Sequence, residues 1–161
     1  MMLLNITLSI LISSVTGNIR LENKAIKQLS KYYDKEVTIV DTGREDLDGR
    51  LYYVAHTHDK VFIGYARSKF ETFDYMVLLD DSNTIKLVKV LVYREDYGGE
   101  VGGKRWLKQW IGVKDRKDFV HAISGATISV NSLKHSINYL LKQLWKIIHI
   151  TIVKVKRILI Q

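Results

Sequence analysis

The sequence predicts an α+β protein, a single domain in which a meander of antiparallel strands is flanked by helices. Two observations lead to this class. Short segments with alternating apolar residues follow one another, separated by tight turns rich in Asp, Asn, Gly and Ser. Segments with apolar residues at helical spacing stand before and after these strands.

The first helix is expected over residues 21–33, where Leu21, Ala25 and Leu29 fall on one face. Strands are expected over residues 37–40, 51–58, 61–69, 73–79 and 85–93. Turns are expected at Asp46–Gly49, at Asp59-Lys60 as a hairpin, and at Asp80–Asn83. Alternation in the last strand puts Ile85, Leu87, Lys89, Leu91 and Tyr93 on one face and Val88, Val90 and Val92 on the other.

Composition places the chain among globular proteins. Its 161 residues suffice for one domain with a buried core, and 47% of them are hydrophobic against 26% charged. It contains no Cys, which excludes thiol catalysis, disulfides and Cys-based metal or iron–sulfur sites. The net charge is +8, but no nucleic-acid-binding motif accompanies it. We therefore expect a solvated basic surface and no nucleic-acid partner.

The two ends of the chain differ from its middle. Residues 1–17 are apolar and resemble a secretory segment cleaved after Gly17, although no Lys or Arg precedes the apolar run; a first strand or buried helix is the alternative. The domain itself is expected over residues 18–145. Residues 146–161 are expected to be a basic extension, either an amphipathic helix that lies on an anionic membrane or an added strand. As a helix, it has an apolar stripe of Trp145, Ile148, Ile152, Val155 and Leu159 beside Lys146, Lys154, Lys156 and Arg157.

A turn of small residues at 121–129 runs directly into a segment with helical spacing. Such a turn delivers free backbone N–H groups and the positive end of a helix dipole to one place, which suits a phosphate group. Ser124, Thr127 and Ser129 add hydroxyls, while Gly125 and Ala126 permit close approach. Asn131 and Ser132 are the expected helix caps. A hydroxyl-rich helix start without a ligand is the alternative.

Several other histidine and aspartate residues are weaker candidates for a functional site. His56 and His58 share one face of an expected strand, but no third metal ligand is apparent, so no metal site is expected. Asp115, Asp118 and His121 are expected to be a solvated approach to the turn.

A glycine-rich stretch, Tyr97–Lys104, is expected to be a mobile loop whose backbone can lie against a flat ring, or a plain flexible loop. Trp106 and Trp110, one helical turn apart, are expected in the core; stacking of one of them near a ring is the alternative.

The sequence resembles the FMN-binding domain family, whose members occur in sodium-translocating NADH:quinone reductases, in Rnf-type electron-transport complexes and as stand-alone extracytoplasmic flavoproteins. Three features, in the order of the family, carry the resemblance, which covers about residues 20–145. They are the motif Ser124-Gly125-Ala126-Thr127 at a helix start, the Glu-bearing, Gly-containing loop Tyr93–Glu100, and the short helix Arg105–Gly112. Ile63–Tyr65 and Phe73–Tyr75 are also similar to family segments.

The resemblance implies an electron carrier with bound FMN and no substrate pocket of its own, hence not an enzyme in the strict sense. Thr127 would carry FMN through a phosphoester bond made by an FAD:protein FMN transferase, and Ser124, Gly125 and Ala126 would surround the phosphate. The loop residues Glu95, Tyr97, Gly98 and Gly99, with Tyr65, would border the isoalloxazine ring. The implied location is extracytoplasmic, with membrane electron-transport proteins as partners.

One residue departs from the family motif. Where the family has an Asp three residues before the Ser, this chain has His121, which differs in charge and geometry and puts covalent attachment in question. Two alternatives stay open: a member that has lost FMN and serves as a structural or interaction module, and a basic protein that binds membrane surfaces through its tail.

Overall fold

The computed structural model describes residues 19–44 and 47–159. The chain divides into two compact units, Met1–Thr38 and Ile39–Gln161. In the first unit the described part holds a helix over residues 19–33, as the sequence predicts, with Ala25 and Leu29 fully buried. The expected signal segment, residues 1–17, lies outside the described residues.

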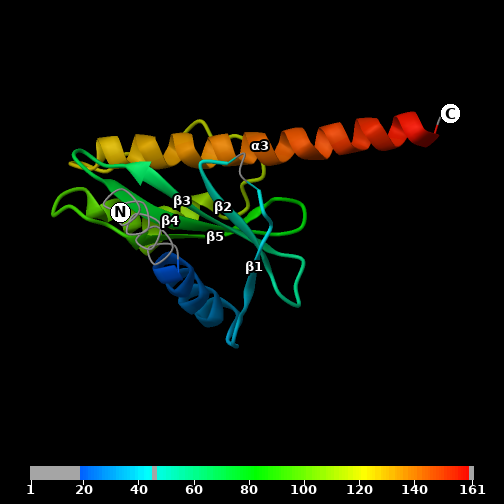
Figure 1. Cartoon of the computed structure of the whole chain (residues 1–161). Helices are drawn as coiled ribbons and strands as arrows, with labels where there is room; N and C mark the ends of the chain where they lie inside the picture. The colour runs from blue at the N-terminus through cyan, green and yellow to red at the C-terminus, as the bar shows by residue number, and fades with distance from the viewer. Residues whose placement is uncertain (1–18, 45–46, 160–161) are drawn as a thin grey trace, which may run out of the picture. The chain divides into compact units, whose positions relative to one another are not determined.

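The second unit contains a five-stranded sheet in the order β1-β2-β3-β4-β5, with every neighbouring pair antiparallel. Its strands are β1 (Ile39–Asp41), β2 (Gly49–Val54), β3 (Lys60–Arg67), β4 (Thr72–Leu79) and β5 (Ile85–Val92). Each strand therefore pairs with the next in the sequence, and the predicted meander and α+β class are confirmed (Figure 1).

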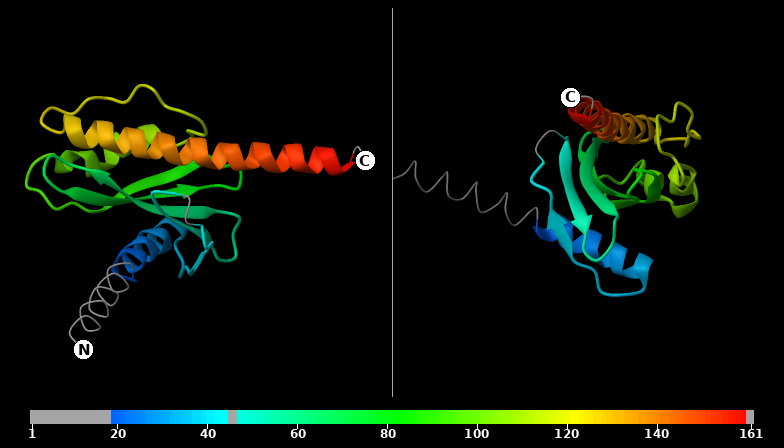
Figure 2. Two further views of the ribbon diagram at one scale, coloured as in Figure 1. Left: turned by 45° about the horizontal axis from the view of Figure 1, so that its top comes forward. Right: turned by 90° about the vertical axis from the view of Figure 1, so that its right-hand side faces the viewer.

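Four helical segments follow the sheet: η1 (Gly99–Gly102), α2 (Lys104–Leu107), η2 (Lys108–Trp110) and α3 (Thr127–Leu159). The expected glycine-rich loop is thus in part a 3-10 helix, because Val101 turns inward and is fully buried. Helix α3 lies across one face of the sheet (Figure 2). Its buried residues Leu133, Ile137 and Leu140 form one core with Phe62, Tyr75 and other inward residues of the strands.

The connection between β2 and β3 is longer than expected. The predicted two-residue hairpin at Asp59-Lys60 is wrong, since β2 ends at Val54 and a turn precedes β3. His56 has a φ of 60° in this turn, so the chain is not extended there. His56 and His58 therefore do not share a strand face. Among the described residues, no group of three or more His, Asp or Glu is placed to hold a metal ion.

The predicted faces of the last strand are wrong at its ends, whereas Val88 and Val90 both lie on the core side, as predicted. The pairing of β4 with β5 shifts between Asp74 and Tyr75 and again between Leu78 and Leu79. Each shift inserts an extra residue, which changes the face that later side chains occupy. As a result Ile85 and Val88 are buried in the same core, although strict alternation would separate them.

The start of α3 also differs from the expectation. The helix begins at Thr127, so Asn131 and Ser132 lie inside it and do not cap it. Ser132 has another role, because β3 continues past Gly64, the last residue that pairs with β2. The Arg67 N–H donates to Ser132 Oγ over 2.7 Å, and Ser136 Oγ donates to the Tyr65 carbonyl over 3.4 Å. Two serines one helical turn apart thus satisfy the open edge of β3.

The C-terminal segment is helical, which decides between the two structures expected for it. Helix α3 runs without a break to Leu159. No helix within the described ranges is both long and apolar enough to cross a membrane.

Candidate functional site

The turn before α3 exposes the first N–H groups of the helix. Gly125 adopts a φ of 80°, which favours glycine, and the Ala126 N–H donates to the Ile123 carbonyl over 3.1 Å. The Val130 N–H donates to the Ala126 carbonyl over 2.9 Å, so Ala126 is the N-cap residue. Alanine has no side-chain acceptor for the N–H groups that follow it. The first turn of α3 is therefore open to an external acceptor such as a phosphate oxygen.

A cavity of about 260 Å³ lies at this helix start. Three separate parts of the chain line it, namely Lys69 from the turn between β3 and β4, Tyr97-Gly98, and residues 125–129. Within it Thr127 is exposed and Ala126 is buried. The structure thus brings together Tyr97, Gly98, Gly125, Ala126 and Thr127, all of them predicted site residues.

Lys69 is a lining residue that the sequence does not predict. It supplies a positive charge beside the open helix start, which suits a ligand that carries a phosphate. No local pattern distinguishes it from the other lysines of the chain. Its position depends on the pairing of β3 with β4, which places the connecting turn near α3.

Beneath the cavity, a hydrogen-bonded pair joins the Tyr97-Gly98 backbone to α3. The Tyr93 hydroxyl donates to the Tyr97 carbonyl over 2.9 Å and lies 2.9 Å from Ser129 Oγ. Because a phenol has one proton, Ser129 must be the donor in the second bond. Ser129 is only 3% exposed, so its hydroxyl lines the cavity from below and is already engaged with Tyr93.

Gly98 fits tightly against this pair. Its φ is 83°, and a Cβ at this position would lie 2.7 Å from the Tyr93 hydroxyl oxygen and 3.3 Å from Ser129 Oγ. Only glycine lets the backbone approach α3 this closely. The backbone of Tyr97-Gly98, with Tyr97 exposed and Gly98 buried, therefore lines the cavity.

Glu95 does not line the cavity. Its carboxylate accepts hydrogen bonds from the Ser68 hydroxyl and from the backbone N–H groups of Phe70 and Glu71, the latter two over 2.8 and 2.7 Å. The Ser68 hydrogen bond, followed by those from the backbone, lowers the pKa of Glu95. Glu95 thus fixes the turn that carries Lys69, and its place in the structure is that of a positioning residue.

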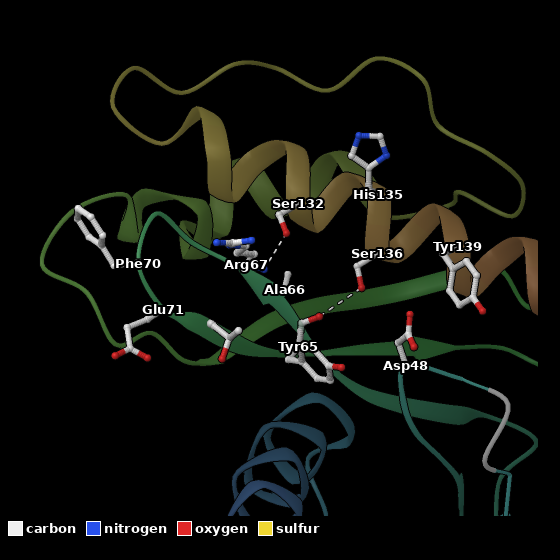
Figure 3. A pocket seen from close by; sticks show the side chains of 11 residues that line it. Asp48, Tyr65, Ala66, Arg67, Phe70, Glu71, Ser132, His135, Ser136 and Tyr139 are labelled. Atoms are coloured by element: carbon white, nitrogen blue, oxygen red, sulfur yellow. Dashed lines mark hydrogen bonds between the residues drawn. The ribbon is translucent and has the colours of Figure 1, made fainter.

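Tyr65, Ser124 and Gly99 are not among the residues that line the cavity at Thr127. Tyr65 is 55% exposed and lines a second cavity of about 680 Å³ (Figure 3). That cavity lies between the open end of β3 and α3, and Phe70, His135 and Tyr139 also line it. The turn that Glu95 holds contributes Lys69 to one cavity and Phe70 to the other.

The approach to the turn is held by backbone contacts. The His121 N–H donates to Gln109 Oε1 over 3.0 Å, and Trp106 Nε1–H donates to the His121 carbonyl over 2.7 Å. The imidazole of His121 is exposed and meets the Phe119 ring edge to face. Asp118 pairs with Arg116 at the surface.

The tryptophan pair belongs mainly to the core. Trp110 is fully buried, as predicted, and Trp106 packs against the same core. Stacking of Trp106 on a bound ring remains a prediction.

A family model described as the FMN-binding domain matches residues 71–142. The match includes the loop of Tyr97-Gly98, the turn at Thr127 and the part of α3 that packs in the core. Lys69 lies just outside it. No curated protein matches the chain.

Proposed function

Residues 71–142 belong to the FMN-binding domain family, and on this basis we propose that the chain binds FMN at the cavity beside Thr127 and carries electrons. When bound, FMN supplies one- and two-electron redox chemistry, while the protein supplies attachment, orientation and electrostatics. The phosphate is held by the open N–H groups of the first turn of α3, with Lys69 as counter-charge. The single observation that carries this proposal is the exposed Thr127 at that helix start, facing Lys69 and Gly98 across one cavity.

The residues present fit a phosphate-bearing ligand. Among the described residues, no Asp or Glu lines the cavity to repel an anion. The carboxylate of Glu95 is turned toward Ser68 and the backbone of Phe70 and Glu71. The Tyr93 hydroxyl, which lies beneath the cavity, occupies the space that a Cβ would need at Gly98. These features favour the cofactor-binding alternative over an empty structural domain.

We further propose that Thr127 is the covalent anchor. In the attachment step its Oγ forms a bond to the flavin-side phosphorus of FAD, the pyrophosphate bond breaks, AMP leaves, and the hydroxyl proton passes to a base of the transferase or to water. Thr127 is exposed and therefore accessible to another protein. His121 is exposed as well, so a transferase can contact its imidazole where the family motif offers a carboxylate.

The proposed setting is extracytoplasmic, with membrane electron-transport proteins as donor and acceptor. The apolar composition of residues 1–17 supports export. A carrier of this kind exchanges electrons with partner proteins at the exposed side of the cofactor and needs no substrate pocket of its own.

The test is co-expression with a flavin transferase, followed by mass spectrometry and a visible spectrum of the denatured chain. We expect the mass of one FMN and yellow colour that survives denaturation. Thr127→Val should abolish both, because the nucleophilic oxygen is lost while the side-chain shape is nearly kept. Thr127→Ser should retain part of the attachment, and His121→Asp should raise the yield if the transferase reads that position.

The matched control is Thr38→Val, the same substitution at an exposed threonine outside the family match, which should leave attachment unchanged. Ser129→Ala is unsuitable as a control, because the Ser129 hydroxyl is buried and bonded to Tyr93. If the chain stays colourless with the transferase and excess FMN, the cofactor proposal is wrong, and the structural alternative replaces it.

A further inference from the structure

The C-terminal part of α3 runs beyond the core of its unit. Leu144 is the last residue of the helix in the buried core cluster. Residues 145–159 add about 22 Å of helix past that point. Figures 1 and 2 both show α3 continuing past the edge of the sheet.

The core-packed part of α3 nucleates the helix over residues 145–159, but these residues themselves favour a helix in water only weakly. Helices shorter than about 12–15 residues are marginal even when rich in alanine. This segment is instead rich in β-branched residues, which lose side-chain freedom in a helix: Ile147, Ile148, Ile150, Thr151, Ile152, Val153, Val155 and Ile158. An apolar environment on one side would therefore stabilise the helical conformation of residues 145–159.

The sequence of the helix divides into two arcs at 100° per residue. One arc carries no charge: Trp145, Ile147, Ile148, Thr151, Ile152, Val155, Ile158 and Leu159. The opposite arc holds all the cations, Lys146, Lys154, Lys156 and Arg157, together with His149, Ile150 and Val153. No Asp or Glu occurs anywhere in α3, from Thr127 to Leu159, so the charge along the whole helix has one sign.

We propose that residues 145–159 of α3 lie on the surface of an anionic membrane, with the uncharged arc in the acyl boundary and the Lys and Arg residues toward lipid phosphates. Trp145 is 53% exposed and stands where the helix leaves the core, a position suited to the membrane–water interface. The proposal is independent of FMN binding.

Two other arrangements fit the observations less well. A second copy of this helix could cover the uncharged arc, but the cations at the edges of that arc, Lys154 and Lys156, would then face like charges, and α3 has no acidic residue to pair with them. A membrane-spanning orientation is not supported either, since no described helix is apolar and long enough for it. Basic residues also stabilise the last turn of a helix through its dipole, but Lys146 lies far from that turn.

The test is the partition of the full chain, without flavin, between buffer and lipid vesicles. Vesicles of phosphatidylglycerol and phosphatidylcholine are compared with vesicles of phosphatidylcholine alone. We expect binding only to the anionic vesicles, weakening as salt is added. Replacing Lys154, Lys156 and Arg157 by Gln, a good helix former, should reduce partitioning by roughly two orders of magnitude, at about fivefold for each cation near the surface.

The matched control replaces Lys104, Arg105 and Lys108 by Gln, since these three are exposed on α2 and η2. Both variants change the net charge equally and keep the apolar residues 1–17, so their difference reports the tail alone. Trp145 provides a second readout, because its fluorescence should shift to the blue with anionic vesicles and Trp145→Phe should remove that shift.

Equal partitioning to both vesicle types would overturn the proposal, as would an equal loss of partitioning in the two triple variants. A dimer in the absence of lipid that the tail substitutions dissociate, measured by sedimentation velocity, would likewise overturn it and identify a second copy as the partner.

Discussion

Gly98 marks the closest approach of the 97–98 backbone to α3, so its replacement by alanine tests the packing beneath the cavity. A left-handed backbone costs a residue with a Cβ about 1–2 kcal/mol. The new Cβ would also displace the Tyr93 hydroxyl, 2.7 Å away, from its bonds to Tyr97 and Ser129, at about 1 kcal/mol for each bond lost. We expect Gly98→Ala to lower the free energy of unfolding by about 3–4 kcal/mol.

Gly112 is a matched control for the backbone part of this effect. Its φ is also 83°, but nothing lies within 4 Å of the position of its Cβ. Gly112→Ala should therefore lower the free energy of unfolding by only about 1–2 kcal/mol. In a Tyr93→Phe background, which lacks the clashing oxygen, Gly98→Ala should have the same effect as Gly112→Ala.

Urea unfolding of the four variants, compared at constant slope, measures these differences. Flavin attachment, assayed as for Thr127, should fall with Gly98→Ala and stay unchanged with Gly112→Ala. Equal loss of stability in Gly98→Ala and Gly112→Ala would refute the packing argument, because the two positions would then differ in no energetic respect.

Three further predictions concern the walls of the cavity and the start of the chain. Because hydrogen bonds lower the pKa of Glu95 in the folded state, they stabilise the fold above the unfolded-state pKa of about 4, and the effect is lost as the pH falls through the lowered value. Glu95→Gln should remove that part of the acid dependence of the urea midpoint; an unchanged profile would contradict it. Lys69→Gln should weaken FMN binding and reduce its salt dependence, measured by flavin fluorescence titration, without changing stability. N-terminal mass analysis of the protein from its own host should find the chain starting after about Gly17, and an intact Met1 in a soluble fraction would disprove export.

The sequence alone predicts those parts of the fold that depend on local patterns. The first helix, expected over residues 21–33, the meander of strands and the first part of the final helix follow from the spacing of apolar residues, while the pattern beyond residue 145 allows either a helix or a strand. The family resemblance predicts that Tyr97-Gly98 and the turn at Thr127 border one site, and in the structure these segments line one cavity.

The errors come from backbone features that side-chain patterns do not encode. The shifts in the pairing of β4 with β5 change which residues face the core, although the apolar alternation of β5 looks regular. Alternation also continues past Val54 into residues of the following turn, so the sequence predicts the end of β2 too late. At α3 the N-cap is Ala126, which carries none of the side chains by which a helix start is recognised.

The positions of Glu95 and Lys69 could not be predicted from the sequence for a different reason. Both depend on contacts between segments far apart in the sequence. The Glu95 carboxylate, after β5, accepts hydrogen bonds from Ser68, Phe70 and Glu71 in the turn between β3 and β4. The family resemblance points to Glu95, but it implies contact with the flavin ring. The structure instead assigns its carboxylate to the turn that presents Lys69.

Tyr93 and Glu95 stand two residues apart, directly after β5, and each holds one of the segments that line the same cavity. Tyr93 fixes the Tyr97-Gly98 backbone against α3, and Glu95 fixes the turn that carries Lys69. The short segment between β5 and η1 therefore positions two of the three segments that line the cavity at Thr127. Each of the three residue types in this stretch makes a different contact. The Tyr93 hydroxyl donates to the Tyr97 carbonyl, and the Glu95 carboxylate accepts from the N–H groups of Phe70 and Glu71. Gly98 lets the backbone lie close to the Tyr93 hydroxyl.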